Sequence, residues 1–572
     1  MMIQRLQRLF VVSALSFFVV ASATSMSQKS PITDESIHLA AGYSYLVAGD
    51  FWLNPEHPPL VKMVAAVPLL LLRLDSQQDD SSWKEKDPRR FTLRFVFHNT
   101  LPAEVIVFWG RVPIVLVGAA LGWFVFWWSR QLAGPIAGIL ALALYVFDPN
   151  LLAHSQLVTT DLGLAVFFTL AVYSLVRYLA GPTRVTLWVA GAAFGLALLT
   201  KSSALLLVPV YAALSLVHRL RHGVAAIWAC WWRLGAVMIV TTVVLAFVVY
   251  GFEVRTAGRP PTTLVSLLER HTSPSSLLRK GVLAIGSVVP VPAPSFWKGM
   301  IVATRHGLEG HPGPSYLRGQ RYLGGRLDYF PVAFAVKTPV GTMGLLFAAL
   351  AVFAFRVLVR RANAPVTLDE WGILLSVAVF FGVSLLNRIN IGLRHILPVY
   401  PLMFIFIAVQ LVWLGGRAGG WVKHLVVLGI VALVAFVAVS SLRIYPHYLA
   451  YFNELAGGPA NGWRYLADSN LDWGQDLPRL KAYLGRHQID EVYLSYAGTA
   501  PPAYYGIRYR PLPTNEEVAR TGVPRGVVAV SVSMLLLALP ADSWVWGYRP
   551  TATIGHSIWI FDLRRGGADT VR

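Results

Sequence analysis

Cysteine and charged residues are scarce in this sequence of 572 residues. The single cysteine, Cys230, excludes an intrachain disulfide framework and any zinc site built from several cysteines. Charged residues make up 14% of the chain, well below the roughly 25% of soluble domains, whereas 55% of the residues are hydrophobic. This balance excludes an ordinary soluble protein, and the length allows a large helical membrane bundle with one small additional domain.

Acidic residues are especially few, because 29 Asp and Glu stand against 49 Lys and Arg, a formal net charge of +20. Such an excess is typical of proteins that bind nucleic acids or anionic membranes. The sequence has no basic segment interleaved with aromatic residues, so no nucleic acid partner is expected. In a protein with many membrane spans, lysines and arginines gather on cytoplasmic loops, and membrane lipids are therefore the expected partners of this charge.

Long apolar runs supply the membrane spans. Residues 9–26 follow Arg5 and Arg8, a pattern that fits either a first transmembrane helix or a signal peptide. Both alternatives place residue 30 onward outside the cytoplasm. Several later runs are shorter than the roughly 20 residues that cross a bilayer. Counting the first run, the sequence predicts about eleven transmembrane helices, at residues 9–26, 105–129, 136–150, 162–179, 186–200, 203–217, 233–250, 331–357, 371–387, 395–415 and 421–441.

The distribution of charge predicts the orientation of these spans. If the N-terminus is cytoplasmic, the connections on the cytoplasmic side contain only two acidic residues, Asp369 and Glu370. Basic residues near helix ends mark the cytoplasmic side, so we expect a multi-pass protein with its C-terminus outside. The basic residues of these connections are Arg130, Arg177, Arg184, Arg219, Arg221, Arg233, Arg356, Arg360, Arg361, Arg417 and Lys423.

Three long segments are expected outside the membrane, at residues 27–104, 251–330 and 442–572. Residues 251–330 are rich in Pro, Gly and Arg, which predicts a loop with short structured pieces at most. The last segment loses the apolar runs, and its patterns predict a helix followed by strands at residues 476–485, 491–495, 526–531 and 557–561. We therefore predict an all-α polytopic membrane domain over residues 1–441 and a small extracytoplasmic α/β domain over residues 442–572.

The first outer segment contains titratable residues close to the expected membrane surface. Asp34 and Glu35 stand at the start of a predicted helix, where capping of the helix explains them as well as chemistry does. His57 precedes two prolines that turn the chain into the next apolar run. Lys62 lies in that run, and extension of its side chain to the membrane surface is the alternative to a functional role.

A second acidic residue and a set of cations lie at the outer ends of later spans. Asp161 opens one span, where it also fits a helix cap. Lys201, Arg394 and His395 lie at outer ends, and Arg111 lies within the second span. Cations on the outer side are unusual under the positive-inside pattern, although surface extension explains any single one. An anionic ligand would explain the set, phosphate above all, because a guanidinium group matches two phosphate oxygens.

Four short motifs follow one another in a defined order along residues 1 to about 440. In this order the sequence resembles the GT-C glycosyltransferases, in particular the protein O-mannosyltransferase clan and the bacterial lipid A aminoarabinose transferases. The phrases GLRHILPVYP and LADSNLDWGQDL further resemble bacterial phospholipid carrier-dependent glycosyltransferases. The motifs are Asp34-Glu35, Pro58-Pro59-Leu60 with Lys62 after it, Thr159-Thr160-Asp161, and Thr200-Lys201.

This resemblance implies a GT-C-like bundle in a bacterial inner membrane, with a first outer loop that forms part of the active site. It implies a sugar on a polyprenyl phosphate as donor, and it assigns the catalytic carboxylates to Asp34, Glu35 and Asp161. Where the aminoarabinose transferases have a lysine before Pro-Pro-Leu, this chain has His57. Lys62 is therefore expected to replace that phosphate contact, or a neutral His57 to donate a hydrogen bond. The other expected substrate-binding residues are Arg111, Lys201, Arg394 and His395.

The predicted reaction is transfer of the sugar, with inversion, to an acceptor protein, lipid or glycan. Asp34 would accept the proton of the acceptor hydroxyl while cations stabilise the leaving phosphate. No cofactor is required by this reaction. Asp34, Asp161 and a histidine would allow a divalent metal, although no compact ligand motif such as HExxH occurs. The alternatives are a polytopic transporter, which would be expected to show paired halves, and a non-catalytic protein that binds lipid-linked glycans.

Three aspartates near the start of the C-terminal segment, Asp468, Asp472 and Asp476, recur every four residues. The favoured interpretation is that they are surface carboxylates that cap a helix beginning near Leu477. The alternative places Asp468 or Asp472 over the active site and gives the C-terminal domain a part in recognising the acceptor.

Overall fold

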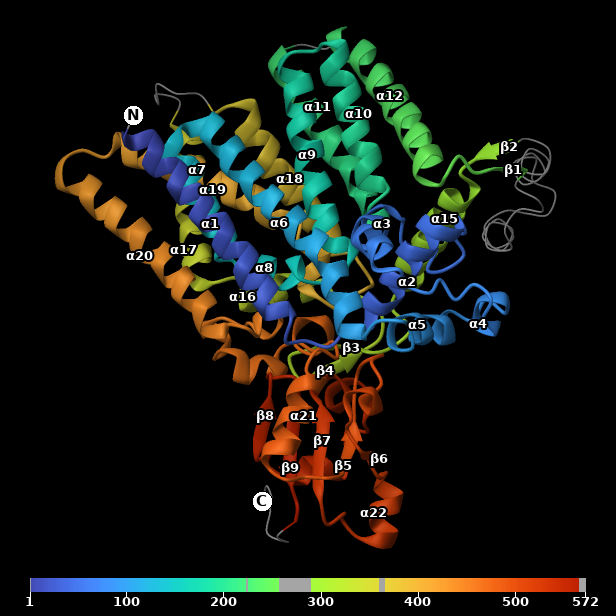
Figure 1. Ribbon diagram of the computed structural model, residues 1–572. Helices are drawn as coiled ribbons and strands as arrows, with labels where there is room; N and C mark the ends of the chain where they lie inside the picture. Colours follow the sequence, from blue (N-terminus) through green and yellow to red (C-terminus); the bar gives the residue numbers. More distant parts are fainter. Residues whose placement is uncertain (1, 223–224, 257–289, 360–365, 565–572) are drawn as a thin grey trace.

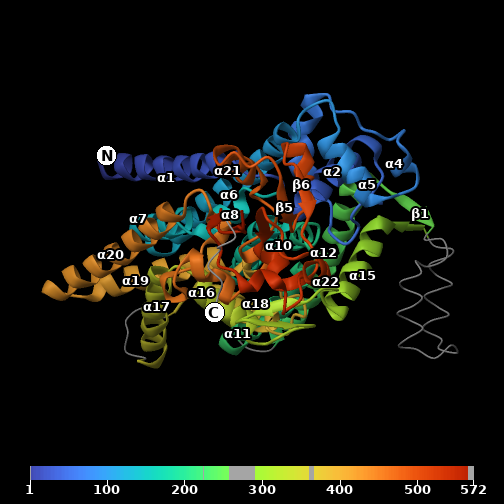
Figure 2. The same cartoon turned by 90° about the horizontal axis from the view of Figure 1, so that it is seen from below.

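The computed structural model describes residues 2–222, 225–256, 290–359 and 366–564. Figure 1 shows a bundle of long helices and, beyond one end of the bundle, a small sheet formed by C-terminal residues. Seen from below, this C-terminal region lies over the middle of the bundle end, while α1 and α20 extend past it (Figure 2). The predicted fold class, a polytopic helical bundle with a small C-terminal α/β region, is confirmed.

Within the described residues, seven helices are long and apolar enough to cross a membrane, or eight if one bent pair counts as a single span. The bent pair, α7 and α8, turns by 65° at its break. The protein is therefore a multi-pass membrane protein. The helices are α1 (Met2–Met26), α6 (Ala103–Ala133), α7 (Pro135–Val146), α8 (Pro149–Ser155), α9 (Thr160–Ala180), α12 (Ala225–Val249), α17 (Val340–Leu358), α19 (Val399–Arg417) and α20 (Gly420–Ile444).

The remaining predicted spans correspond to shorter helices, so the predicted number of about eleven exceeds the number that is long enough to cross unaided. These are α10 (Arg184–Leu198), α11 (Leu207–His222) and α18 (Leu368–Ser384). The span predicted at residues 331–357 begins too early, because the helix long enough to cross begins at Val340. Two helices, α16 (Tyr329–Lys337) and α17, replace it, because Pro339 follows α16 and cannot continue its hydrogen bonding.

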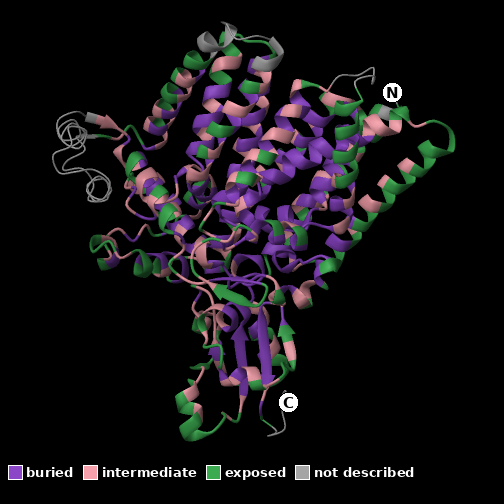
Figure 3. Cartoon of the chain, turned by 180° about the vertical axis from the view of Figure 1, so that it is seen from behind, coloured by how far each residue is buried: buried purple, intermediate pink, exposed green. Residues whose placement is uncertain are grey.

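Burial separates the central helices from those at the periphery of the bundle. In the most apolar stretches of α9 and α19, 72% of the residues are buried, against 17% in α20. Figure 3 shows buried residues concentrated in the middle of the bundle and exposed residues along α20. Because the exposed residues of α20 include Leu425, Leu428 and Val431, this apolar helix faces lipid rather than water.

The first outer segment folds against the end of the bundle as α2 (Thr33–Ala48), α3 (Leu60–Ala66), α4 (Ser81–Lys84) and α5 (Pro88–Phe97). Helices α2 and α3 cross closely at Gly42, where a Cβ atom would lie 2.0 Å from the carbonyl oxygen of Lys62. Only glycine permits this approach. The crossing fixes α2, and with it Asp34, relative to α3.

Residues 251–330 contain more structure than the sequence predicts. The 16-residue helix α15 (Pro294–Glu309) contradicts the expectation of short structured pieces, and proline at its start fits the first turn of a helix. Two antiparallel pairs accompany it: β1 (Val254–Thr256) with β2 (Pro290–Pro292), and β3 (Ser315–Leu317) with β4 (Gln320–Tyr322). Residues 257–289 of the predicted loop lie outside the described residues.

The C-terminal sheet has the strand order β6-β5-β7-β9-β8. Strand β5 runs parallel to β6 and β7, whereas β9 is antiparallel to β7 and β8. The predicted helix and three strands correspond to α21 (Leu477–Arg486), β5 (Val492–Ser495), β7 (Val527–Ser531) and β9 (Ile558–Asp562). The sequence did not predict β6 (Tyr509–Pro511), α22 (Asn515–Thr521) or β8 (Ala552–Ile554), which are short.

Candidate active site

Asp34 lies in the first turn of α2, at the end of the helix that faces the C-terminal region. The helix ends at Gly49, whose φ of 62° requires the left-handed conformation that glycine adopts without strain. The Asp34 side chain is 30% exposed. It is therefore accessible to a ligand, and the positive end of the helix dipole stabilises its negative charge.

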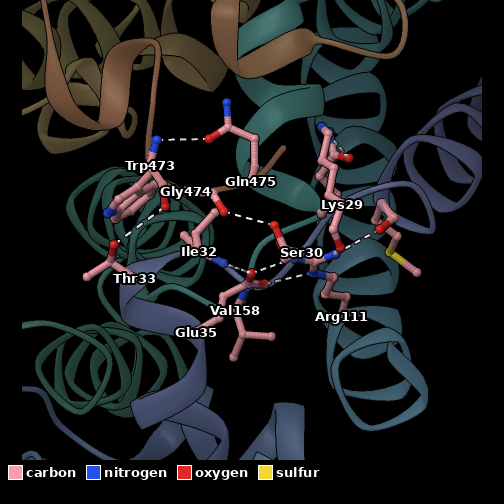
Figure 4. Close-up of polar contacts among 12 residues, drawn as sticks. Lys29, Ser30, Ile32, Thr33, Glu35, Arg111, Val158, Trp473, Gly474 and Gln475 are labelled. Atoms are coloured by element: carbon pink, nitrogen blue, oxygen red, sulfur yellow. Dashed lines mark hydrogen bonds and ion pairs between the residues drawn. The ribbon is translucent and has the colours of Figure 1, made fainter. Parts of the chain in front are cut away.

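Glu35, the neighbouring carboxylate, is fully buried and has partners for both oxygens (Figure 4). Its Oε2 accepts a hydrogen bond from the backbone N–H of Ile32 at 2.9 Å, and its Oε1 accepts one from Val158 at 2.9 Å. Arg111 binds both oxygens, with Nε 2.8 Å from Oε1 and Nη2 2.6 Å from Oε2. Glu35 thus holds the first turn of α2 against two other parts of the bundle.

Arg111 is also occupied beyond this ion pair. Its Nη1 donates to the carbonyl oxygens of Met26 at 2.8 Å and Lys29 at 3.3 Å, and its Nη2 donates to Ser30 at 3.1 Å. The guanidinium group therefore ties the end of α1 and the following loop to α6. In this structure Arg111 contacts protein groups and not the cavity described below.

Four of the predicted residues form a continuous chain of ion pairs. Arg394 Nη1 lies 3.0 Å from Asp34 Oδ2 and 3.5 Å from Asp161 Oδ2. Lys201 Nζ lies 2.5 Å from the other oxygen of Asp161. Asp161 begins α9, Lys201 follows α10, and Arg394 lies in the short 3₁₀ helix Leu393–Ile396. The fold thus brings together side chains that are up to 360 residues apart in the sequence.

Arg394 stacks on an aromatic ring from the C-terminal segment. Its guanidinium carbon lies 4.1 Å from the centre of the Trp473 ring, a distance at which a cation and an aromatic face attract each other. The Trp473 carbonyl oxygen accepts hydrogen bonds from the backbone N–H of Thr33 at 3.2 Å and from the Thr33 hydroxyl at 3.5 Å, beside Asp34; Figure 4 shows the hydroxyl contact. Sequence reasoning did not include Trp473 in the site, since no local pattern indicates which residue it contacts.

Several buried nitrogens near these ion pairs have no hydrogen-bond partner. Among the residues that the structure describes, these include Nδ1 of His57 and His154, Nε2 of His395 and Nε of Arg394. Burial is the main cause that holds the pKa of His57 well below its usual range, and nearby His38 and Lys201 add to it. A neutral His57 ring can donate one hydrogen bond to an anionic ligand.

Lys62, the predicted phosphate contact, is fully buried within the first outer segment. Its ammonium group donates to the hydroxyl of Tyr45 at 3.0 Å and to the carbonyl oxygens of Asn54 at 2.9 Å and His57 at 2.7 Å. The Asn54 side-chain oxygen lies 3.2 Å away as a fourth acceptor, so neutral groups of the protein satisfy all three donors of the ammonium group. In the structure, Lys62 therefore links parts of the first outer segment by hydrogen bonds, and it does not belong to the chain of ion pairs.

A cavity of about 330 Å³ opens beside Asp34 and Arg394. Its other walls come from the C-terminal residues, including Asp468, Trp473 and Thr499. The segment that carries these residues is fixed to the bundle, because Ser30 Oγ donates to the carbonyl oxygen of Gly474 at 2.9 Å (Figure 4). The cavity is thus bounded jointly by the first outer segment, the loop before α19 and the C-terminal region.

The C-terminal aspartates differ from the favoured prediction. Asp472 and Asp476 are buried and not on the surface, so that interpretation is wrong. Asp472 accepts hydrogen bonds from the backbone of Ser533 at 2.8 Å and Gly474 at 3.3 Å, while burial raises the pKa of its carboxyl to about 7. Asp468 and Asp472 both line the cavity, as the alternative interpretation expected, and burial raises the pKa of Asp468 above its usual value.

The described residues contain no group of three or more His, Cys, Asp or Glu side chains arranged to hold a metal ion. Asp34 and Asp161, the carboxylates considered for a metal, are instead joined through Arg394. Their charges are balanced by side-chain cations of the protein itself.

The sequence matches one protein family model over part of its length. Residues 105–249 match the model described as dolichyl-phosphate-mannose-protein mannosyltransferase. This segment runs from α6 to α12 and contains Arg111, Asp161 and Lys201, but neither Asp34 nor Arg394. No curated protein matches the sequence.

Solved structures with a similar course of the chain have low sequence identity to this protein. ArnT from Cupriavidus metallidurans bound to undecaprenyl phosphate is 15% identical, with a TM-score of 0.45 and coverage of 96% of this chain and 97% of that chain. The apo form is 14% identical, with a TM-score of 0.47 and coverage of 99% of both chains. The Archaeoglobus fulgidus oligosaccharyltransferase is 12% identical, with a TM-score of 0.46 and coverage of 91% and 70%.

The fold and the family match together define a multi-pass membrane protein whose residues 105–249 are similar to the protein mannosyltransferases, which are GT-C glycosyltransferases. The predicted resemblance to the clan of the protein O-mannosyltransferases is confirmed by the match to residues 105–249.

Proposed function

We propose that this protein transfers a sugar from a polyprenyl-phosphate donor to an acceptor hydroxyl on the outer side of a bacterial inner membrane. The observation that carries this proposal is the chain of ion pairs from Asp34 through Arg394 and Asp161 to Lys201. It joins one accessible carboxylate to two cations at the end of a membrane bundle. The match to a family that uses a polyprenyl-phosphate sugar supports the choice of donor.

Asp34 is the proposed general base. As the acceptor oxygen attacks the anomeric carbon, its proton passes to Asp34 and the new carbon–oxygen bond forms. The bond between that carbon and the phosphate oxygen breaks, and its electron pair leaves with the lipid phosphate. Attack opposite the leaving group inverts the configuration. General-base assistance of this kind contributes roughly 10²–10⁴ in rate.

Arg394 and Lys201 are the proposed contacts of the leaving phosphate, which departs as an anion and needs no general acid. Cations already fixed in place stabilise the charge that develops on it. The buried ring nitrogens of His57, His154 and His395 are suitable further donors. A buried donor without a partner costs roughly 1–3 kcal/mol, so their occurrence together supports an anionic ligand at this position.

Asp161 and Glu35 have positioning roles in this proposal. Asp161 is fully buried and holds both Lys201 and Arg394, so it fixes the geometry of the two cations. Glu35 is saturated by Arg111 and by two backbone N–H groups, and it fixes the turn that presents Asp34. These contacts favour Asp34 over Glu35 as the base.

We further propose that the C-terminal region and the site lie outside the cytoplasm. The opposite end of the bundle carries ion pairs between arginines and acids of the predicted cytoplasmic connections, namely the part-buried pair of Arg177 with Asp369 and the buried pair of Arg356 with Glu370. Arginine at this end agrees with the positive-inside pattern.

Three functions are separated by one experiment on the full-length protein in sealed vesicles. Polyprenyl-phosphate sugars that carry labelled hexose, pentose or aminopentose are placed in the membrane together with extracts of envelope acceptors. Transfer of label to another molecule supports the proposal. Label that only crosses the bilayer supports a transporter, and label that stays bound to the lipid supports a binding protein. Arg394→Gln should abolish transfer, whereas Arg388→Gln, at an exposed arginine nearby, should not.

A further inference from the structure

The cavity beside Asp34 has walls with an unusual balance of charge. Asp34 and Asp468 both line it, whereas Arg394 is the one lysine or arginine among its described lining residues. That guanidinium group is already paired with Asp34 and Asp161 and covered by Trp473. In the proposed function Arg394 also contacts the leaving phosphate of the donor, so a second phosphate, on the acceptor, would meet the carboxylates of Asp34 and Asp468 with no further lysine or arginine and only the imidazole of His311.

Two carboxylate oxygens remain to accept hydrogen bonds from a ligand. Asp34 uses Oδ2 for Arg394, and Asp468 uses Oδ1 for the backbone N–H of Ser469 at 2.5 Å. Their other oxygens have no hydrogen-bond partner within the described part of the chain. The two side chains come from α2 and from the segment before α21, and they interact electrostatically across the cavity. Each can thus bind a different hydroxyl of the same ligand.

We propose that this cavity is the acceptor subsite and that it takes an uncharged sugar of a glycan, with Asp468 as a specificity-determining residue. The inference rests on the proposed function, which assigns the attacking hydroxyl to Asp34. Asp468 then accepts a hydrogen bond from a second hydroxyl of the same sugar. A serine or threonine side chain offers one hydroxyl only, so Asp468 would have to accept from a backbone N–H, whereas one sugar ring presents hydroxyls to both carboxylates; a glycan therefore fits the two carboxylates better than a protein acceptor.

Binding of small probes to the full-length protein in lipid nanodiscs tests the inference directly. The probes are methyl α-mannopyranoside, its 6-phosphate and N-acetylserinamide, compared by saturation-transfer NMR titration. We expect the neutral glycoside to bind roughly tenfold or more tightly than the other two, because its second hydroxyl meets a carboxylate. Equal or tighter binding of the phosphate would overturn the inference. Equal binding of the serine derivative would replace the glycan by a protein acceptor.

Two variants locate the binding in this cavity. Asp468→Asn removes the charge, and asparagine tolerates the φ of 58° at this position, so folding should be preserved. We expect it to weaken glycoside binding roughly tenfold and to reduce the discrimination against phosphate. Asp490→Asn, at an exposed aspartate of the same region, should change neither. Thr499→Trp, at an exposed position in the cavity wall, should block the glycoside; an unchanged affinity would overturn the assignment.

Release of sugar to water from polyprenyl-phosphate donors distinguishes this inference from the proposed function. Wild-type protein that hydrolyses a donor but binds no glycoside overturns the acceptor assignment alone. Wild-type protein that binds the glycoside in the cavity but hydrolyses none of the donors contradicts the proposed function, while glycan recognition by the cavity stands. Unfolding temperatures of all variants, measured in the same nanodiscs, show which of them retain the fold.

Discussion

Replacing Arg111 by methionine removes the guanidinium group that neutralises the buried Glu35 carboxylate. Arg111 is 1% exposed and Glu35 is fully buried, so water cannot replace the lost charge. Breaking one partner of a buried ion pair costs about 3–5 kcal/mol. Typical proteins are stable by about 5–15 kcal/mol, so we expect Arg111→Met to lose a large share of the stability.

The double variant Arg111→Met, Glu35→Leu separates the buried charge from the other contacts. It removes the unpaired carboxylate and should therefore be more stable than Arg111→Met alone. It should still be less stable than the wild type, because three carbonyl oxygens lose the donors that Arg111 supplies. Arg89→Met, at an exposed arginine of the first outer segment, is the matched control.

Thermal unfolding in nanodiscs, followed by tryptophan fluorescence, measures these effects. We expect the wild type and Arg89→Met to have the highest unfolding temperatures, the double variant a lower one and Arg111→Met the lowest. If the free energy of unfolding of Arg111→Met lies within about 1 kcal/mol of the wild-type value, the buried pair does not anchor α2 as described. The same conclusion follows if the double variant is the least stable of the four proteins.

Two further predictions concern the surroundings of the site. Gly42→Ala should lower both the unfolding temperature and the transfer rate, because its Cβ would lie 2.0 Å from the carbonyl oxygen of Lys62. Gly429→Ala, at a site with open space, should change neither. Equal effects of the two substitutions would refute the tight crossing of α2 and α3. Burial lowers the pKa of Lys29 to about 7, so charging it below that pH costs stability, and this cost disappears as pH rises toward the unfolded value. Lys29→Met should therefore raise the unfolding temperature most near pH 6 and least near pH 10, and a gain that does not change with pH would contradict it.

The helices of the bundle follow closely from the sequence because long apolar runs are strong local signals. The ends of the helices follow less well. The break at Pro339 was missed, since the apolar pattern continues across it and only the missing N–H interrupts the helix. The helix Pro294–Glu309 was missed because its proline-rich surroundings favour a loop.

The candidate site was predicted in its charges and only partly in its contacts. Asp34, Asp161, Lys201 and Arg394 do come together, as their predicted common position at the outer helix ends suggested. The buried pair of Glu35 and Arg111 was not foreseen. Whether the hydrogen bonds of a buried charged side chain are all satisfied depends on which backbone groups from distant segments lie beside it. No local sequence pattern indicates those neighbours.

The contribution of the C-terminal segment shows the same limit. Trp473 and Asp468 reach the site by contacts with residues about 80 and more than 400 positions away in the sequence. The four-residue spacing of Asp468, Asp472 and Asp476 indicated a helix face, whereas the structure uses the segment as a buried connection between bundle and sheet.

Single-turnover transfer by Asp34→Asn tests the central claim most directly. The donor is the polyprenyl-phosphate sugar that the wild type uses, and Asp79→Asn, at an exposed aspartate of the same outer segment, is the control. We predict that Asp34→Asn slows transfer roughly 10²–10⁴-fold while the donor still binds, and that the wild-type product has the inverted anomeric configuration. Transfer by Asp34→Asn at close to the wild-type rate would contradict the assignment of Asp34 as the base.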